Sequence, residues 1–126
     1  SNSHEDNVAQ MQFDYLKERA ESGESFIVLG RCADYVLREY EGLVKIFVTG
    51  EMDTKVKRIA SIEKLRYDDA KNLVEKCNKI RRSYHNRYSK YKWGDSRYYD
   101  LLINTSKVGI DNATDVIDAY IKSIIE

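Results

Sequence analysis

Hydrophobic residues recur at every third or fourth position in several stretches of the chain, which is the spacing of one face of an α-helix. The stretches that predict helices cover residues 5–22, 53–60, about 68–80 and about 111–124. Gly23 directly follows the first stretch and is expected to end that helix, while Asp53 is expected to cap the second. A shorter helix is expected over 33–38. The last stretch has a broad apolar stripe that must pack against another element.

Unbroken apolar runs predict short β-strands at residues 26–29, 43–48 and 101–103. Runs of this kind suit strands that are buried on both faces of a parallel sheet. Because they alternate with the expected helices, the fold class is α/β, with helices layered on a parallel sheet. Three strands make a small sheet, which is the first indication that part of the domain is missing.

Composition narrows the classes of function. A chain of 126 residues without proline is expected to form a single domain, or one piece of a domain, over 1–126. Lys plus Arg equals Asp plus Glu at 21 each, so no overall field attracts nucleic acid or an anionic membrane. No apolar run reaches the roughly 20 residues that span a bilayer. We therefore expect a cytoplasmic protein with neither nucleic-acid nor membrane partners.

The cysteine and histidine pattern gives no sign of a metal site. Cys32 and Cys77 lack the spacing of metal ligands and are expected to be reduced thiols, with a disulfide as the less favoured alternative. His85 has no carboxylate near it in sequence, and neither HExxH nor CxxC is present. The sequence thus predicts no protein-bound metal, although Mg²⁺ would arrive with a nucleotide.

Arg31 lies in the turn that follows the first expected strand. In open α/β sheets, ligands bind beyond the carboxyl ends of the strands, and an arginine there can bind a phosphate through two parallel hydrogen bonds. The alternative, which the pattern taken alone favours, is an ordinary strand-to-helix turn with a surface arginine.

Polar residues continue the apolar face of the long helix. After Ile80, the same side carries Arg81, Tyr84, His85 and Tyr88. A helix that leaves the core to line a cleft has this pattern, but so does a solvated basic helix end, and spacing does not decide between them. The basic and aromatic stretch that follows, from Lys90 to Tyr99, is typical of a single-strand nucleic-acid binder, a nucleotide-site lid or a surface loop.

Three segments taken together resemble the cytidylate kinase-like family. They are FIVLGRCADYVL at 26–37, KWGD at 92–95 with the following Tyr99-Asp100, and NTSKVGI at 104–110. The segments stand in the order and spacing of that family, and the resemblance covers the chain from about Val8 to Ile121.

The resemblance implies a nucleoside-monophosphate kinase of the P-loop type, with a three-layer α/β/α fold around a parallel sheet. It also implies transfer of a phosphoryl group from ATP, with Mg²⁺, to CMP or dCMP. On that basis Arg31 holds the acceptor phosphate, and Arg81, beside a lid over about 81–99, acts on charge at the phosphates. The other implied nucleotide-binding residues are Asp34, Arg58, Tyr84, His85, Tyr88, Asn104, Ser106 and Lys107. Of these, the tyrosines and histidine line the acceptor or lid side, Arg58 lies near the donor base, and 104–107 forms a loop beside the donor adenine.

Departures from the family pattern qualify these expectations. Cys32 stands where typical bacterial cytidylate kinases have an aspartate that reads cytosine, and the lid helix has His85 and Tyr88 where they have aspartate and arginine. The sequence contains no GxxxxGK[ST] phosphate loop. We therefore expect an incomplete domain whose first strand and phosphate loop come from an N-terminal segment of the same or another chain. Without that segment these 126 residues are expected to be inactive. The alternatives are a non-catalytic nucleotide-binding module and a nucleic-acid contact module.

Overall fold

The computed structural model describes residues 3–125, and the chain divides into two compact units. Unit 1 holds the residues up to Leu43 together with Ser83–Trp93, and unit 2 holds Val44–Arg82 together with the residues from Gly94 on. Helices dominate, and a small parallel sheet accompanies them. The expected α/β character is therefore confirmed.

Unit 1 is built on the helices α1 (His4–Glu21) and α2 (Ala33–Val36). Ser3 begins α1, because its side chain accepts a hydrogen bond from the Asp6 backbone N–H. Gly23 follows the helix with φ +80°, a left-handed conformation that suits glycine. The helix predicted over 5–22 is thus confirmed. Its buried residues, Ala9, Phe13 and Leu16, form one face that packs with α2 and the turn before it.

The strand predicted at 26–29 is not present among the described residues. Phe26 and Val28 pack on the buried cluster of Leu16, Ala33 and Leu37. Ile27 and Leu29 point the other way and are 88% and 89% exposed. The prediction of a strand buried on both faces is wrong for this structure, because no described strand hydrogen-bonds to the segment.

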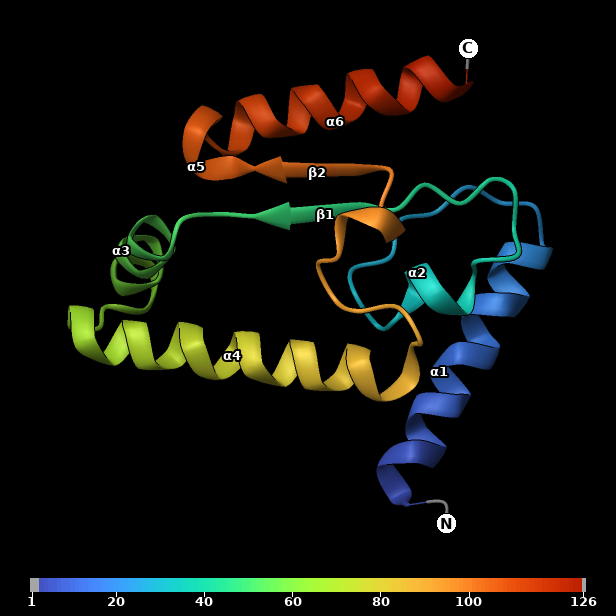
Figure 1. The fold of residues 1–126 in the computed structure, drawn as a ribbon, viewed down its shortest axis with the longest axis horizontal. Helices are drawn as coiled ribbons and strands as arrows, with labels where there is room; N and C mark the ends of the chain where they lie inside the picture. Colours follow the sequence, from blue (N-terminus) through green and yellow to red (C-terminus); the bar gives the residue numbers. More distant parts are fainter. Residues whose placement is uncertain (1–2, 126) are drawn as a thin grey trace. The chain divides into compact units, whose positions relative to one another are not determined.

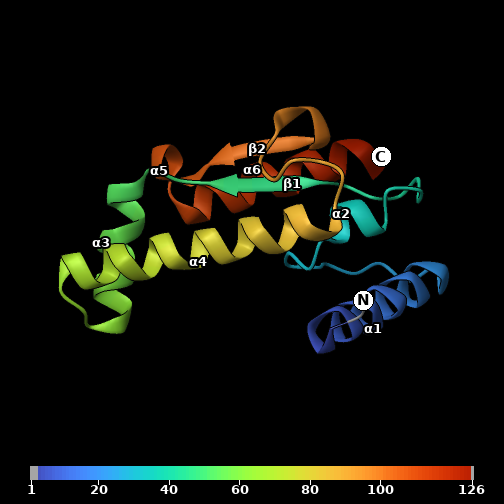
Figure 2. The same cartoon turned by 60° about the horizontal axis from the view of Figure 1, so that its bottom comes forward.

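Unit 2 contains a two-stranded parallel sheet, β1 (Ile46–Thr49) and β2 (Leu101–Asn104). Ile46 pairs with Leu101 and Thr49 with Asn104. Figures 1 and 2 show both strands pointing toward the same end, where α3 (Met52–Glu63) and α5 (Thr105–Val108) begin. The two later strand predictions are confirmed, the first of them with a start at 46 in place of 43. The remaining elements are α4 (Tyr67–Tyr88), the 3₁₀ turn η1 (Ser96–Tyr98) and α6 (Ile110–Ile125).

The best-buried side chains of unit 2 lie between α3 and α4. Val56 is 0% exposed and contacts Ala70 and Val74 of α4. Asp53 does not cap α3 as predicted: Glu51 holds the N-cap position, and the Asp53 carboxylate accepts a hydrogen bond from the Tyr67 hydroxyl at 2.8 Å. Asp53 therefore links the first turns of the two helices.

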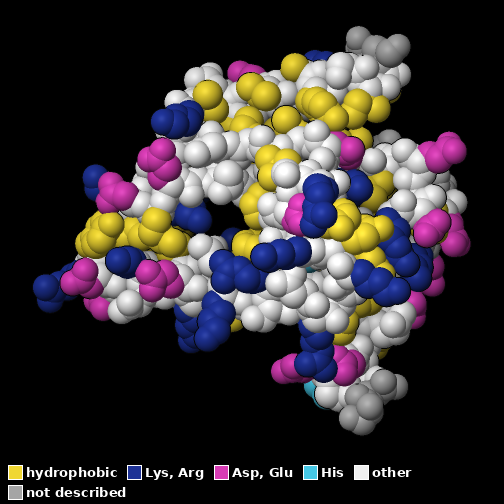
Figure 3. All heavy atoms as spheres, in the orientation of Figure 1, with side chains coloured by type: hydrophobic (Ala, Val, Ile, Leu, Met, Phe, Trp, Pro, Cys, Tyr) yellow, Lys and Arg dark blue, Asp and Glu magenta, His cyan; other side chains and the backbone are white. Residues whose placement is uncertain are grey.

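The apolar stripe of α6 is only slightly covered. Among its described residues Ala113 is buried, whereas Val116 is 44% and Ile124 is 52% exposed. Figure 3 shows hydrophobic side chains gathered over this helix. Ile117, Tyr120 and Ile121 are half-buried, so the stripe packs in part, as expected, and leaves part of its surface exposed. None of the described helices has the length and hydropathy needed to cross a membrane.

Candidate functional site

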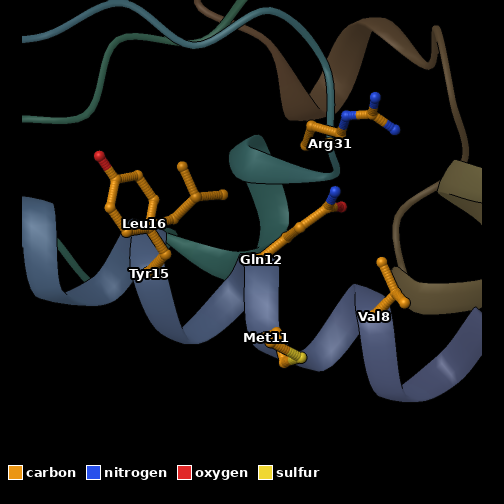
Figure 4. A pocket seen from close by; sticks show the side chains of 6 residues that line it. All are labelled: Val8, Met11, Gln12, Tyr15, Leu16 and Arg31. Atoms are coloured by element: carbon orange, nitrogen blue, oxygen red, sulfur yellow. The ribbon is translucent and has the colours of Figure 1, made fainter.

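A hollow of about 390 Å³ opens beside Arg31 in unit 1. Its floor is one face of α1, where the lining residues are Val8, Met11, Gln12, Tyr15 and Leu16. Figure 4 shows the guanidinium of Arg31 above this face, with the Gln12 side chain rising from α1 beneath it. The hollow therefore combines an apolar and aromatic surface, one amide and one permanent positive charge.

The backbone that carries Arg31 is left-handed over consecutive residues. Gly30 has φ +70°, and Arg31 and Cys32 both have φ +57°. The left-handed conformation costs a non-glycine residue about 1–2 kcal/mol, so surrounding contacts must hold it. Burial of Cys32 and Ala33 against the unit 1 core supplies those contacts. The turn thus holds Arg31 outward while its neighbours are fixed inside.

Tyr84 of α4 lies next to Arg31, so the structure brings these two predicted site residues together. Burial raises the pKa of the Tyr84 hydroxyl, and the positive charge of Arg31 acts in the opposite direction. The same hydroxyl donates to the Gln12 side-chain oxygen at 3.5 Å, and its ring meets that of Tyr88 edge-on at 5.1 Å. Arg31, Tyr84 and Gln12 therefore form one contiguous group.

Asp34 and His85 form a buried pair. His85 Nε2 lies 2.9 Å and 3.1 Å from the two carboxylate oxygens of Asp34, although the residues are 51 positions apart. The imidazole is 5% exposed and therefore faces the interior of unit 1. No carboxylate lies near this histidine in sequence, because the fold brings Asp34 to it from α2.

Cys32 lies beside this pair. Its side chain is 2% exposed, and its thiol donates to the His85 carbonyl oxygen at 3.9 Å. Burial raises the pKa of Cys32 to about 12, so the free thiol keeps its proton at neutral pH. Both cysteines are free, as predicted.

Tyr88 is held by Asp6 near the start of α1. Its hydroxyl donates to the Asp6 carboxylate at 2.6 Å, and Arg87 donates two hydrogen bonds to the same group at 2.9 Å and 3.0 Å. These bonds fix the end of α4 on α1. Asp6 and Gln12 were not identified from the sequence, since polar residues on an amphipathic helix give no signal of their partners.

Short-range contacts hold the segment from the end of α4 to η1, on both sides of Trp93. The Trp93 backbone N–H donates to the Asn86 side chain at 3.0 Å, and the rings of Tyr35 and Tyr91 meet edge-on at 5.1 Å. Arg97 forms an ion pair with Asp95 at 2.7 Å. The lid-like region predicted over about 81–99 comprises the end of α4, this loop and η1, and its role as a lid stays a prediction.

A second polar group lies in unit 2, where β1 and β2 end. The Asn104 side chain accepts from the Ser106 N–H at 2.9 Å and so caps α5. Ser106 Oγ in turn accepts from the Glu51 N–H at 2.8 Å, and Lys107 reaches the Glu51 carboxylate at 3.8 Å. Residues 104–107, predicted to form a loop, are instead a capped helical turn, because Asn104 satisfies its first N–H groups.

The remaining predicted site residues, Arg58 and Arg81, also belong to unit 2. Arg58 is exposed on α3, and Arg81 is exposed on α4. Within unit 1, the structure therefore gathers Arg31, Tyr84 and Tyr88 around α1, with the Asp34–His85 pair beneath the turn. Their roles toward a nucleotide stay predictions.

The sequence matches a known family. The profile described as the cytidylate kinase-like family covers residues 1–107. A cytidylate kinase of Saccharolobus islandicus is 27% identical over 124 residues, which are 93% of this chain and 65% of that protein. A cytidylate kinase of Halobacterium salinarum is 28% identical over 109 residues, covering 83% of this chain and 56% of that protein. The chain thus spans less than two thirds of the length of these relatives.

A solved structure has the same fold. The crystal structure of an uncharacterized protein from Eubacterium ventriosum superimposes with a TM-score of 0.90 and is 40% identical in sequence. The superposition covers 96% of this chain and 68% of that protein. The arrangement of helices and strands described above is therefore shared with a natural, longer relative.

Proposed function

The chain belongs to the cytidylate kinase-like family, and we propose that the protein containing it transfers a phosphoryl group from ATP to a nucleoside monophosphate. The relatives named cytidylate kinase support CMP or dCMP as the acceptor. A non-catalytic nucleotide-binding module is the second candidate, because the sequence has no GxxxxGK[ST] phosphate loop.

The hollow beside Arg31 carries the proposal. A nucleoside monophosphate needs a cation for its phosphate and an apolar surface for its base, and these two features adjoin here. Arg31 is exposed at the rim, and the left-handed turn holds its position. We assign Arg31 to the acceptor phosphate, with Tyr84 and Tyr88 as the wall of the acceptor side.

Recognition of the acceptor base would fall to Gln12. Cys32, at the position where the resemblance implies a cytosine-reading aspartate, is buried, donates to a backbone carbonyl and does not line the hollow, so it is not presented to a base bound there. The Gln12 amide offers both a donor and an acceptor inside the hollow. A pyrimidine base that presents one hydrogen-bond acceptor and one donor on the same edge can bind this amide through two hydrogen bonds.

The donor side would be served by residues of unit 2. Arg81 is assigned to the charge that develops on the phosphates, Arg58 to the donor base, and 104–107 to the region of the adenine. Magnesium is treated as part of the MgATP substrate, and no side chain of this chain is assigned to it. Catalysis of phosphoryl transfer depends mainly on positioning the two nucleotides and on stabilising the charge that develops on the transferred phosphoryl group.

The phosphates of ATP need a clamp that the residues of this sequence do not provide. Residues 26–29 have no strand partner among the described residues, and the Ile27 and Leu29 side chains are exposed, which supports the proposal that a further strand pairs with this segment. In the three-layer P-loop fold that the resemblance implies, a strand of this kind leads into the phosphate loop.

The test is substitution of Arg31 in the full-length protein. We predict that Arg31→Ala lowers kcat/KM for CMP by roughly 100-fold or more, since lost charge stabilisation of this kind typically costs two to three orders of magnitude. Steady-state kinetics with MgATP and CMP measure this, and circular dichroism checks the fold.

Two variants sharpen the interpretation. Arg66→Ala removes an exposed arginine before α4 and is expected to leave kinetics unchanged, whereas Arg31→Lys retains charge but not the planar fork and is expected to be intermediate. Near-normal transfer by Arg31→Ala would overturn the assignment. Tight nucleotide binding without turnover by the unsubstituted protein would favour the non-catalytic module.

A further inference from the structure

Cys32, Asp34 and His85 bring three different metal-ligating groups together under the Arg31 turn. One potential ligand atom from each residue lies within 4.8 Å of the others. Cys32 and Asp34 come from the turn into α2, and His85 comes from α4. We propose that this cluster is a binding site for a divalent transition-metal ion, with Zn²⁺ as the best match.

The state of the histidine supports a ligand at this place. Nε2 faces the Asp34 carboxylate, so in the neutral ring that nitrogen carries the proton. Nδ1 then has a free lone pair, yet it is buried and has no hydrogen-bond partner among residues 3–125. A buried acceptor without a partner is unfavourable, because it has lost its hydrogen bonds to water. Transfer of the ring proton from Nε2 to Nδ1 leaves the lone pair of Nε2, which lies beside Asp34, available to a metal.

The spacing of the three groups is close to that of a metal centre. Zn–N and Zn–O bonds of about 2.0–2.1 Å and a Zn–S bond of about 2.3 Å place tetrahedral ligands roughly 3.3–3.7 Å apart. The Asp34 and His85 atoms are now 2.9 Å apart, and no pair in the group exceeds 4.8 Å. Shifts of about an ångström or less per side chain would therefore complete the geometry.

The donor set selects the kind of ion. Thiolate, imidazole and carboxylate together suit Zn²⁺, whereas Mg²⁺ takes oxygen ligands and would not use Cys32. On binding, the Cys32 thiol transfers its proton to solvent and the thiolate bonds to the metal, so one proton is released for each ion. Three protein ligands leave a fourth position for water.

The metal would act on the Arg31 turn. Cys32 is one of the left-handed residues of that turn, and His85 adjoins Tyr84 on α4. A bond from both residues to one ion would tie the turn to the helix and hold Arg31 over the hollow. This inference rests on the cluster itself and stands whether or not the protein is a kinase.

The experiment measures metal binding directly. The full-length protein is stripped with a chelator, and Zn²⁺ is titrated by calorimetry at two buffer ionisation enthalpies, which also reports the proton released. Co²⁺ is titrated separately into the metal-free protein as a spectroscopic probe, because a thiolate ligand gives a sulfur-to-cobalt charge-transfer absorption. We expect one ion per chain, with a charge-transfer band.

Single substitutions identify the ligands. Cys32→Ser and His85→Gln are each expected to weaken Zn²⁺ binding by roughly 100-fold or more, and Cys32→Ser should abolish the charge-transfer band. Cys77→Ser is the matched control, since Cys77 is the second free cysteine and lies outside the cluster. It is expected to bind as the unsubstituted protein does. Chemical denaturation of each metal-free variant checks that it is folded.

Several results would overturn the proposal. They are the absence of a binding isotherm with folded protein, a cobalt spectrum without a thiolate band, and equal loss of binding in Cys77→Ser. If His85→Gln fails to fold, Asp34→Asn replaces it. Undiminished Zn²⁺ affinity in both Asp34→Asn and Cys32→Ser, each measured as a single variant, would then contradict the site. Zinc binding by a protein that shows no kinase activity would support this inference while contradicting the proposed function.

Discussion

At the scale of single residues, Asp6 connects α1 with the end of α4. The hydrogen bond from Arg87, together with that from Tyr88, holds the pKa of the Asp6 carboxyl well below its usual 3.8. A lowered native pKa means that the carboxylate stabilises the fold above about pH 4 and that this contribution is lost as the pH falls through the native pKa. We predict that Asp6→Asn lowers the melting temperature at pH 7, and that the difference from the unsubstituted protein shrinks between pH 4 and pH 2, as measured by thermal denaturation.

Asp14→Asn on the same helix is the matched control, because Asp14 is exposed and accepts one hydrogen bond from Gln10. It should change the melting temperature little. A difference for Asp6→Asn that stays constant down to pH 2 would show that packing, and not charge, stabilises the contact.

Residue positions within the site could be predicted only where a sequence pattern carried them. Arg31 stood out because it follows an apolar run and a glycine, and Tyr84 and Tyr88 stood out by helical spacing. The partners of His85 and Tyr88 were not predictable, because Asp34 and Asp6 are 51 and 82 positions away. Such pairings depend on tertiary packing, which periodicity does not encode.

At the scale of elements, the contact of α3 with α4 depends on one small side chain. Val56 is fully buried against Ala70 and Val74. Removing two methyl groups there loses burial and leaves a cavity, so we predict that Val56→Ala lowers the free energy of unfolding by about 2–3 kcal/mol. Urea denaturation measures the loss. Val116→Ala on α6, where the side chain is 44% exposed, is expected to be near neutral. An equal effect of both substitutions would contradict the burial argument.

Helices were predicted well because their apolar faces have a local period, and α4 shows this most clearly: it begins at Tyr67, beside the expected start at Asp68. Strands were less predictable, because a strand exists only when a partner supplies its hydrogen bonds. Residues 101–103 have that partner in β1, and residues 26–29 have none among the described residues. The apolar run at 26–29 did not become a strand, because an apolar run does not determine whether another strand is present to hydrogen-bond with it.

At the scale of the whole molecule, large apolar side chains lie exposed in both units. Ile27 and Leu29 are 88% and 89% exposed, and Ile125 at the end of α6 is 76% exposed. Exposure of this extent is unfavourable in water at about 25 cal/mol per Å². The proposed function therefore requires two things of a further segment: that it covers the apolar surface at Ile27 and Leu29, and that it supplies a loop for the donor phosphates.

These two requirements make a single prediction for residues 1–126 expressed alone. We expect no transfer of phosphate from MgATP to CMP, because the sequence has no loop to hold the donor phosphates, and we expect strong binding of a hydrophobic dye to the uncovered edge at Ile27 and Leu29. A coupled kinase assay and dye fluorescence measure both, with the full-length protein as the active control. Leu29→Asp in the full-length protein should lower its stability, because a charge would then lie in the proposed strand interface. Turnover by the 126 residues alone would contradict the proposal that transfer requires a phosphate loop that this sequence does not contain.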